Sequence, residues 1–187
     1  MAYRINQTQI ELLNADITEQ CVDAIVNAAN ASLAGGGGVD GTIHRAGGPE
    51  IMKETREKYL QGCPTGSAVA TGAGNLPAKY VFHAIGPVWS GGTQGEPEKL
   101  QSTYHRCLEL AVELGCRSIA FPSISTGAYG YPVEKAAPVV IETVLDFLRN
   151  RPDHGIELVR FCLFSQFALR EYSKILRDES GMENARG

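Results

Sequence analysis

An aspartate and a histidine that can carry acid–base chemistry stand four positions apart, at Asp40 and His44. On an α-helix this spacing places both side chains on one face, so a carboxylate and an imidazole can share one site. Taken without context, Asp40 is interpreted as the N-cap of a helix that starts there, and His44 as a half-buried histidine with a partner. A carboxylate at a helix N-terminus keeps its charge, which makes it a weak base but a good acceptor for a water molecule.

Two loops of small residues allow the backbone to approach a ligand closely. Residues 35–38 are four consecutive glycines, and residues 123–130 read Ser-Ile-Ser-Thr-Gly-Ala-Tyr-Gly. Each loop stands between a predicted strand and a predicted helix, where backbone N–H groups can bind an anion without lysine or arginine. The pair predicts a diphosphate held from both sides at the carboxyl ends of strands. Ordinary glycine-rich turns are the alternative interpretation.

These loops need strands and helices to position them, and the hydrophobic pattern predicts both in alternation. The predicted strands are residues 10–13, 24–26, 67–71, 79–85, 118–121 and 156–164. The predicted helices are residues 40–46, 50–60, 98–114, 133–150 and 167–177, and Pro138 either kinks the fourth of them or marks its true start. The alternation predicts an α/β sandwich with helices on both faces of the sheet.

Length and composition fit one domain with its own core. The chain has 187 residues, of which 43% are hydrophobic and 20% charged, as in ordinary globular proteins. We expect a single domain over residues 1–177, followed by a disordered C-terminal tail over residues 178–187. No apolar run approaches the roughly 18 residues of a membrane span. The N-terminal residues do not resemble a signal peptide, so a cytoplasmic protein is expected.

Charge and cysteine content narrow the possible partners. The net charge is −4 and no dense lysine or arginine cluster occurs, so broad nucleic-acid binding is not expected. The chain has five cysteines, an odd number, and no CxxC pair, so we expect neither a disulfide framework nor a zinc site. No other metal and no cofactor are expected. Six residues of chemical interest are interpreted as structural: Cys21, Cys63, Cys107, Cys116, Cys162 and His83.

Of three common nucleotide-binding or hydrolase motifs, the sequence contains one in incomplete form and lacks the other two. Gly36, Gly38 and Gly41 formally match the dinucleotide-binding fingerprint, but the region about 20 residues later ends a helix and offers no ribose-binding acid. A nicotinamide-dependent oxidoreductase is therefore disfavoured. The sequence contains no Gly-Lys dipeptide and no Gly-x-Ser-x-Gly, which excludes a P-loop and a nucleophile elbow.

Five segments, in this order, resemble the motifs of macrodomains of the MacroD type. They are residues 14–18 (NADIT), 26–30 (VNAAN), 35–44 (GGGGVDGTIH), 80–87 (YVFHAIGP) and 119–127 (IAFPSISTG). The resemblance spans nearly the whole chain and includes the bacterial O-acetyl-ADP-ribose deacetylases. It implies a three-layer α/β/α sandwich around a mixed central sheet, with a cleft for ADP-ribose.

The resemblance also implies a role for individual residues. Asp16 accepts a hydrogen bond from the adenine amino group, Phe164 stacks on adenine, and Asn30 binds the distal ribose. Asp40 positions or activates the attacking water, with Asn30 and His44 as the other catalytic residues. The family usually has glycine where this chain has Ala15, next to the adenine site. The remaining ligand-binding positions are Ile17, Gly37, Gly38, Val39, Ser125, Thr126, Gly127, Ala128 and Tyr129.

Plainer interpretations exist for several of these residues. Asp16 is typical of a turn cap, Asn30 of a bend before the glycines, and Phe164 of a core aromatic. The function implied by the resemblance is hydrolysis of acyl esters on the distal ribose of ADP-ribose. The partners are then O-acyl-ADP-ribose and mono-ADP-ribosylated proteins. The alternative is a non-catalytic module that reads ADP-ribose, which the joint presence of Asn30, Asp40 and His44 disfavours.

Overall fold

The computed structural model describes residues 2–184, with side chains described as far as residue 179. Within this range seven strands form one sheet in the order β1-β2-β7-β6-β3-β5-β4. Their bounds are Ala2–Ile5, Thr8–Leu13, Ala24–Ala28, Ala68–Gly72, Tyr80–Ala84, Ser118–Phe121 and Leu158–Cys162 for β1 to β7. The five inner strands are parallel, whereas β1 and β4 pair antiparallel at the two edges. The sheet is therefore mixed.

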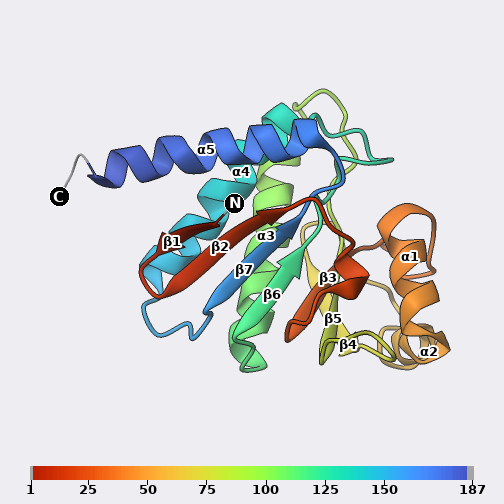
Figure 1. Cartoon of the computed structure of the whole chain (residues 1–187). Coiled ribbons are helices and arrows are strands. Elements are labelled where there is room, and N and C mark those ends of the chain that lie inside the picture. The colour runs from red at the N-terminus through yellow and green to blue at the C-terminus, as the bar shows by residue number, and fades with distance from the viewer. Residues whose placement is uncertain (1, 185–187) are drawn as a thin grey trace.

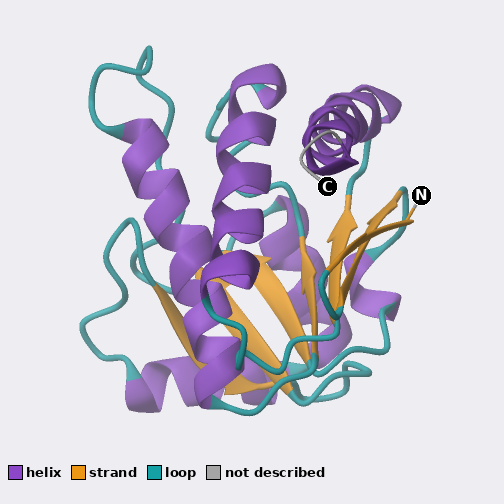
Figure 2. Ribbon diagram, turned by 90° about the vertical axis from the view of Figure 1, so that its left-hand side faces the viewer, coloured by secondary structure: helices purple, strands orange, loops and turns teal. Residues whose placement is uncertain are grey.

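Helices cover both faces of this sheet (Figures 1 and 2). The short 3₁₀ helix η1 (Ile17–Glu19), α1 (Gly38–Gly47) and α2 (Pro49–Lys58) pack on one face. The long helices α3 (Glu96–Glu113), α4 (Val133–Asn150) and α5 (Gln166–Asn184) pack on the other. This arrangement confirms the three-layer α/β/α sandwich.

Helices cover both faces of the sheet, and side chains alternate along each strand, so the inner strands contribute side chains to a core on either face. In β3, Val26 belongs to the apolar core under α3, α4 and α5, and its neighbour Ile25 belongs to the core under α1 and α2. Aromatic rings connect the larger core, with Phe161 of β7 lying 5.5 Å from Tyr172 of α5 between ring centroids. The two cores hold the carboxyl ends of the parallel strands rigidly.

Several boundaries differ from the sequence-based expectations. Helix α1 starts at Gly38 with Gly37 as its N-cap, so the interpretation of Asp40 as an N-cap is wrong. Helix α4 begins at Val133, so Pro138 lies inside the helix and does not mark its start. Strand β1 and the 3₁₀ helix η1 were not predicted.

The last helix is longer than expected. Helix α5 runs from Gln166 to Asn184, and so replaces the disordered tail predicted from residue 178 as far as residue 184. Residues 185–187 lie outside the described part of the chain. The apolar side chains Tyr172 and Leu176 are buried in the core, which anchors the helix and lets its polar last turns continue.

The cysteines do not pair. Cys21, just after η1, is exposed, and the other four are buried and free. The described residues contain no group of three or more His, Cys, Asp or Glu side chains that could hold a metal ion. Over the same range, none of the helices has the length and apolar character needed to cross a membrane.

Candidate functional site

A cavity of about 540 Å³ opens at the carboxyl ends of the parallel strands. Its walls come from residues that directly follow β3, β5, β6 and β7. The sheet order explains the position, because after β3 the chain adds β4 and β5 on one side of that strand and then crosses over to add β6 and β7 on the other. The reversal between β3 and β6 is the kind of switch point where open α/β sheets bind ligands.

Most of the predicted site residues line this cavity. They are Asn30, Gly37, Gly38, Val39, Asp40, Ser125, Thr126, Gly127, Ala128, Tyr129 and Phe164. His44, Asp16 and Ile17 do not line it. Among the described residues, no lysine or arginine lies in the lining and Asp40 is its one carboxylate. An anionic ligand there would depend on backbone N–H groups.

Sequence reasoning missed the other lining residues. Those inside the motif segments 26–30, 35–44, 80–87 and 119–127 had a signal in the sequence, whereas the four beyond residue 130 are brought to the cavity by tertiary packing alone. The missed residues are Ala28, Ala29, Gly36, Gly86, Pro122, Ser123, Ile124, Val133, Cys162, Ser165 and Ala168.

The first glycine loop delivers the N-terminus of α1 to the cavity. The N-cap Gly37 makes no side-chain capping bond, so the first-turn N–H groups of the helix remain open to a ligand. The loop lies directly against the helix: a Cβ added at Gly41 would come within 2.6 Å of the Gly36 carbonyl oxygen. Glycine at position 41 is therefore what permits this close approach.

The second loop, residues 123–130, is built by its own hydrogen bonds. Thr126 Oγ1 donates to Ser123 Oγ at 2.7 Å, and the Tyr131 N–H donates to the Ser125 carbonyl at 3.0 Å. Within the described chain, the backbone N–H groups of Gly127, Ala128 and Tyr129 have no hydrogen-bond acceptor. They are free to bind an anion opposite α1.

Ser125 occupies an unusual backbone conformation in this loop. Its φ is 68°, in the left-handed region that costs a side-chain-bearing residue roughly 1–2 kcal/mol. Its buried Oγ has no hydrogen-bond partner among the described residues. A Cβ on Gly86 would come within 2.2 Å of that Oγ, so position 86, two residues beyond β5, must be glycine for Ser125 to fit.

Asn30 closes the first loop with its side-chain amide. Its Nδ2 donates to the Gly35 carbonyl at 2.8 Å, and its Oδ1 accepts from the Ala34 N–H at 3.2 Å and from Ser32 Oγ at 2.8 Å. The bend interpretation of Asn30 is therefore confirmed. Because the amide nitrogen carries two hydrogens, its second N–H remains for a ligand at the cavity wall.

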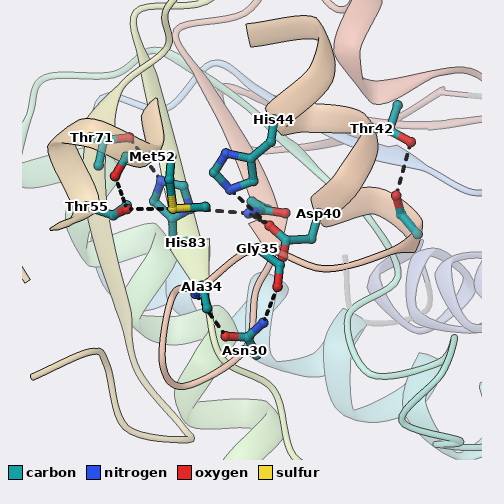
Figure 3. A network of polar contacts seen from close by, with 12 residues as sticks. Asn30, Ala34, Gly35, Asp40, Thr42, His44, Met52, Thr55, Thr71 and His83 are labelled. Carbon is teal, nitrogen blue, oxygen red and sulfur yellow. Dashed lines mark hydrogen bonds and ion pairs between the residues drawn. The ribbon is translucent and has the colours of Figure 1, made fainter. Parts of the chain in front are cut away.

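Asp40 lies in the first turn of α1 and is only 5% exposed. Its Oδ1 accepts a hydrogen bond from Asn27 Nδ2 at 2.7 Å and lies 3.2 Å from His44 Nε2, as the spacing of four residues predicted (Figure 3). Burial by itself raises the pKa of the carboxyl group, but these two side-chain contacts outweigh it and hold the pKa of Asp40 below its usual value. The carboxylate is therefore ionised at neutral pH.

Asp40 lines the cavity, and its second carboxylate oxygen, Oδ2, lies beside Gly36 in the cavity wall. The position that a Cβ on Gly36 would take lies 3.4 Å from Asp40 Oδ2 and 3.8 Å from Asn30 Nδ2. A carboxylate oxygen and an amide nitrogen thus border the same small volume beside Gly36. Such a pair can accept from and donate to one water molecule or ribose hydroxyl.

The opposite end of the candidate site is more open. Phe164 is 62% exposed and lines the cavity, so the core interpretation of this aromatic is wrong. Asp16 caps η1, with Oδ1 accepting from the Thr18 N–H at 2.8 Å and from Thr18 Oγ1 at 2.7 Å, which confirms the turn-cap interpretation. The Ile17 side chain is buried in the core under α1 and α2, so only its backbone can contact a ligand.

The fold and this cavity define a ligand-binding α/β/α domain, and comparison with known proteins places it in a family. The Macro domain profile matches residues 26–140, more than half of the chain. The chain belongs to the Macro domain family.

Named relatives and a solved structure are similar to this chain over most of its length. A Macro domain-containing protein of Caldanaerobacter subterraneus is 56% identical over 169 residues, covering 89% of this chain and 94% of the relative. A protein of Citrobacter koseri named O-acetyl-ADP-ribose deacetylase is 48% identical over 176 residues, covering 92% and 98%. The Oceanobacillus iheyensis macrodomain solved with ADP superposes with a TM-score of 0.91 at 39% identity, covering 97% of both chains.

Proposed function

We propose that this chain is a hydrolase that binds ADP-ribose in the cavity and cleaves acyl esters on its distal ribose. Its substrates are O-acetyl-ADP-ribose and mono-ADP-ribose attached to aspartate or glutamate side chains of proteins. Two loops with free backbone N–H groups face each other across the cavity and suit a diphosphate. The exposed ring of Phe164 suits adenine stacking, and Oδ2 of Asp16 suits the adenine amino group.

The observation that carries the proposal is the state of Asp40. Its carboxylate is ionised, its Oδ1 is engaged by Asn27 and His44, and its Oδ2 lies near Gly36 and Asn30, which line the cavity together with Asp40. An ionised carboxylate with one oxygen fixed and the other free can orient a water molecule for attack. A carboxylate held in this way is what the hydrolase requires, and it favours the hydrolase over a non-catalytic reader of ADP-ribose.

The deacetylation step balances with water as the only co-reactant. The water oxygen forms a bond to the acyl carbon, the bond from that carbon to the ribose oxygen breaks, and the ribose oxygen takes up a proton. Asp40 holds the attacking water, His44 supports the carboxylate, and Asn30 binds the distal ribose. The substrate's own phosphate is the alternative base for the water proton.

The direct test is to incubate the purified protein with O-acetyl-ADP-ribose and to separate the products by chromatography. We expect the ester to disappear with equal release of ADP-ribose. ADP-ribose should also raise the melting temperature more than the same concentration of ADP or NAD, because it fills the whole cavity. Binding without turnover would indicate a reader of ADP-ribose, and equal shifts for the three compounds would indicate a general nucleotide site.

The same site should distinguish between linkages. A glutamate-linked ADP-ribose offers an acyl carbon that the held water can attack, whereas a serine-linked one has no acyl carbon and could be cleaved only at the ribose, with loss of an alkoxide that needs a strong general acid. Near Asp40 the described residues offer neither a pair of carboxylates flanking a glycosidic bond nor a recognised nucleophile motif. Peptides with each linkage, incubated side by side and analysed by mass spectrometry, should show loss of the glutamate-linked label only. Comparable loss of both labels would rule out ester selectivity.

A further inference from the structure

Behind Asp40 lies a chain of buried polar side chains that the proposed chemistry does not use. It runs from Thr71 on β4 through His83 on β5 and Asn27 on β3 to Asp40 on α1. The exposed fractions of Thr71, His83 and Asn27 are 2%, 1% and 0%. Figure 3 shows Thr71, His83, His44 and Asp40 side by side. Polar groups buried this deeply are costly unless they are hydrogen-bonded, so their arrangement needs a reason.

The hydrogen bonds of Thr71 fix the tautomer of His83. Thr71 Oγ1 donates to the Gly72 carbonyl at 2.9 Å, so it can only accept at its 2.9 Å contact with His83 Nε2. The donor at that contact is therefore Nε2–H. Burial, and after it the nearby His44, lowers the pKa of His83 to about 4, so the ring is neutral at physiological pH. A neutral imidazole has a single N–H, which makes Nδ1 an acceptor.

The acceptor on His83 in turn fixes the amide of Asn27. The two residues are register partners on the parallel strands β3 and β5. Asn27 Nδ2 lies 3.2 Å from His83 Nδ1 and 2.7 Å from Asp40 Oδ1, one hydrogen for each acceptor. The reversed amide would turn its oxygen toward a carboxylate and an imidazole lone pair. In the observed orientation, Oδ1 of Asn27 has no partner in the described structure, so Nδ2 alone holds the amide in place.

We propose that His83 is a positioning residue for ester hydrolysis, an inference that rests on the proposed function. As the Nε2–H tautomer, His83 accepts a hydrogen bond from Asn27 and turns that amide to donate to Oδ1 of Asp40. With Oδ1 engaged, Oδ2 is left to hold the attacking water. The ring of His83 also stacks on His44, with centroids 6.0 Å apart, so it borders both groups that contact Oδ1.

Two substitutions at His83 separate positioning from packing. His83→Asn keeps a polar atom near the position of Nδ1, so it can still accept a hydrogen bond from Asn27. His83→Gln keeps a polar atom near the position of Nε2, so it can contact only Thr71. Glutamine is closer to histidine in volume, so a packing role predicts that His83→Gln is the milder change. A positioning role predicts the reverse. His83→Gln should lower kcat for O-acetyl-ADP-ribose by about tenfold to hundredfold with KM little changed. His83→Asn should retain most of the kcat of the unmodified protein.

Thr71 offers a second pair in case either histidine variant fails to fold. Thr71→Val removes the hydroxyl that accepts from Nε2–H at nearly the same volume, and Thr71→Ser retains it. We expect Thr71→Val to lower kcat by about threefold to tenfold and Thr71→Ser to leave it close to that of the unmodified protein. Melting temperatures of all four variants, and their affinity for ADP-ribose, are measured alongside.

The tautomer itself has a readout that does not depend on activity. Long-range ¹H–¹⁵N NMR correlations of His83 in the unmodified protein should show Nε2 protonated and Nδ1 bare at neutral pH. Protonation at Nδ1, or equal kcat for His83→Asn and His83→Gln in an active protein, would overturn the positioning role alone. Absence of turnover by the unmodified protein would instead overturn the proposed function, and this inference with it.

Discussion

Asp16 and Asp40 both follow parallel strands of the sheet, and in both the hydrogen bonds to protein involve Oδ1. Asp16 is half-buried and bonds to Thr18, two residues further along the same turn. Asp40 is nearly fully buried and is held by Asn27 from a neighbouring strand. The same chemical group is thus held locally at Asp16, which we propose as the adenine end of the site, and by the core at Asp40. We expect the first end to contribute affinity and the second to contribute chemistry.

The largest effect is expected from a substitution in the second loop, residues 123–130, because it should affect binding and turnover alike. A Cβ at Gly127 meets no atom within 4 Å, so Gly127→Glu should fold while placing a negative charge among the free N–H groups. ADP-ribose binding and ester turnover should both be lost. The measurement is calorimetry with ADP-ribose, with Gly127→Ala as the control that keeps the space open. Tight binding by folded Gly127→Glu would show that this loop is not the diphosphate site.

Removing the Asp40 carboxylate should lower turnover without a matching loss of affinity. Asp40→Ala should lower turnover by about 10²- to 10⁴-fold while ADP-ribose affinity stays within roughly tenfold. The variant also leaves one of the two hydrogens on the buried Asn27 amide nitrogen without an acceptor, which should cost about 1–3 kcal/mol of stability. Steady-state kinetics and calorimetry on the same preparation give both numbers. Full activity of the folded variant would eliminate the catalytic role of Asp40.

The buried end should also be the one that responds to acid. The pKa of His83 is about 4 in the folded chain against 6.5 for an ordinary histidine, because burial and, after it, His44 oppose its charge, while Asp40 and Glu54 favour it. The unfolded chain therefore binds the extra proton first, and stability falls as the pH drops from 6.5 toward 4. The loss from this group reaches at most about 3 kcal/mol. Urea unfolding of the unmodified protein and of His83→Asn at several pH values should show a shallower decline in the variant.

The smallest effect is expected at the exposed end. Asp16→Asn keeps an oxygen that can cap η1 but replaces the other acceptor with an amide donor. ADP-ribose affinity should fall by about tenfold with an unchanged melting temperature. Asp16→Ala should lose the cap as well, and about 0.5–2 kcal/mol of stability. Unchanged affinity in Asp16→Asn, measured by calorimetry, would remove Asp16 from the adenine site.

The contrast between the two aspartates also marks what the sequence could predict. The alternation of apolar segments predicted the layers, and the four-residue spacing predicted the contact between Asp40 and His44, because both depend on local periodicity. The bond from Asn27 to His83 joins residues 56 positions apart and depends on strand order, which no local pattern contains. His83 was therefore interpreted as structural only.

The elements that differ from the sequence-based expectations, β1 and the start of α1, differ for local reasons. Strand β1 is a four-residue edge strand joined to β2 by a two-residue turn at Asn6, whose φ of 52° is typical of a tight hairpin. That signal was present but too short to stand out. The start of α1 was misplaced because glycine is a poor helix former by propensity, yet here the helix begins with Gly38 where the loop meets the cavity.

The distribution of thiols gives the chain a built-in attachment point for a reporter. Burial raises the pKa of the Cys63 and Cys107 thiols, and brings those of Cys116 and Cys162 to about 11, so these four are poor nucleophiles at neutral pH. Exposed Cys21 is left for a maleimide dye. It adjoins Gln20, whose side chain donates to the Asp16 carbonyl at 2.7 Å. A fluorophore coupled there would sit beside the η1 turn and could follow occupancy of that end by its emission, without any engineered cysteine.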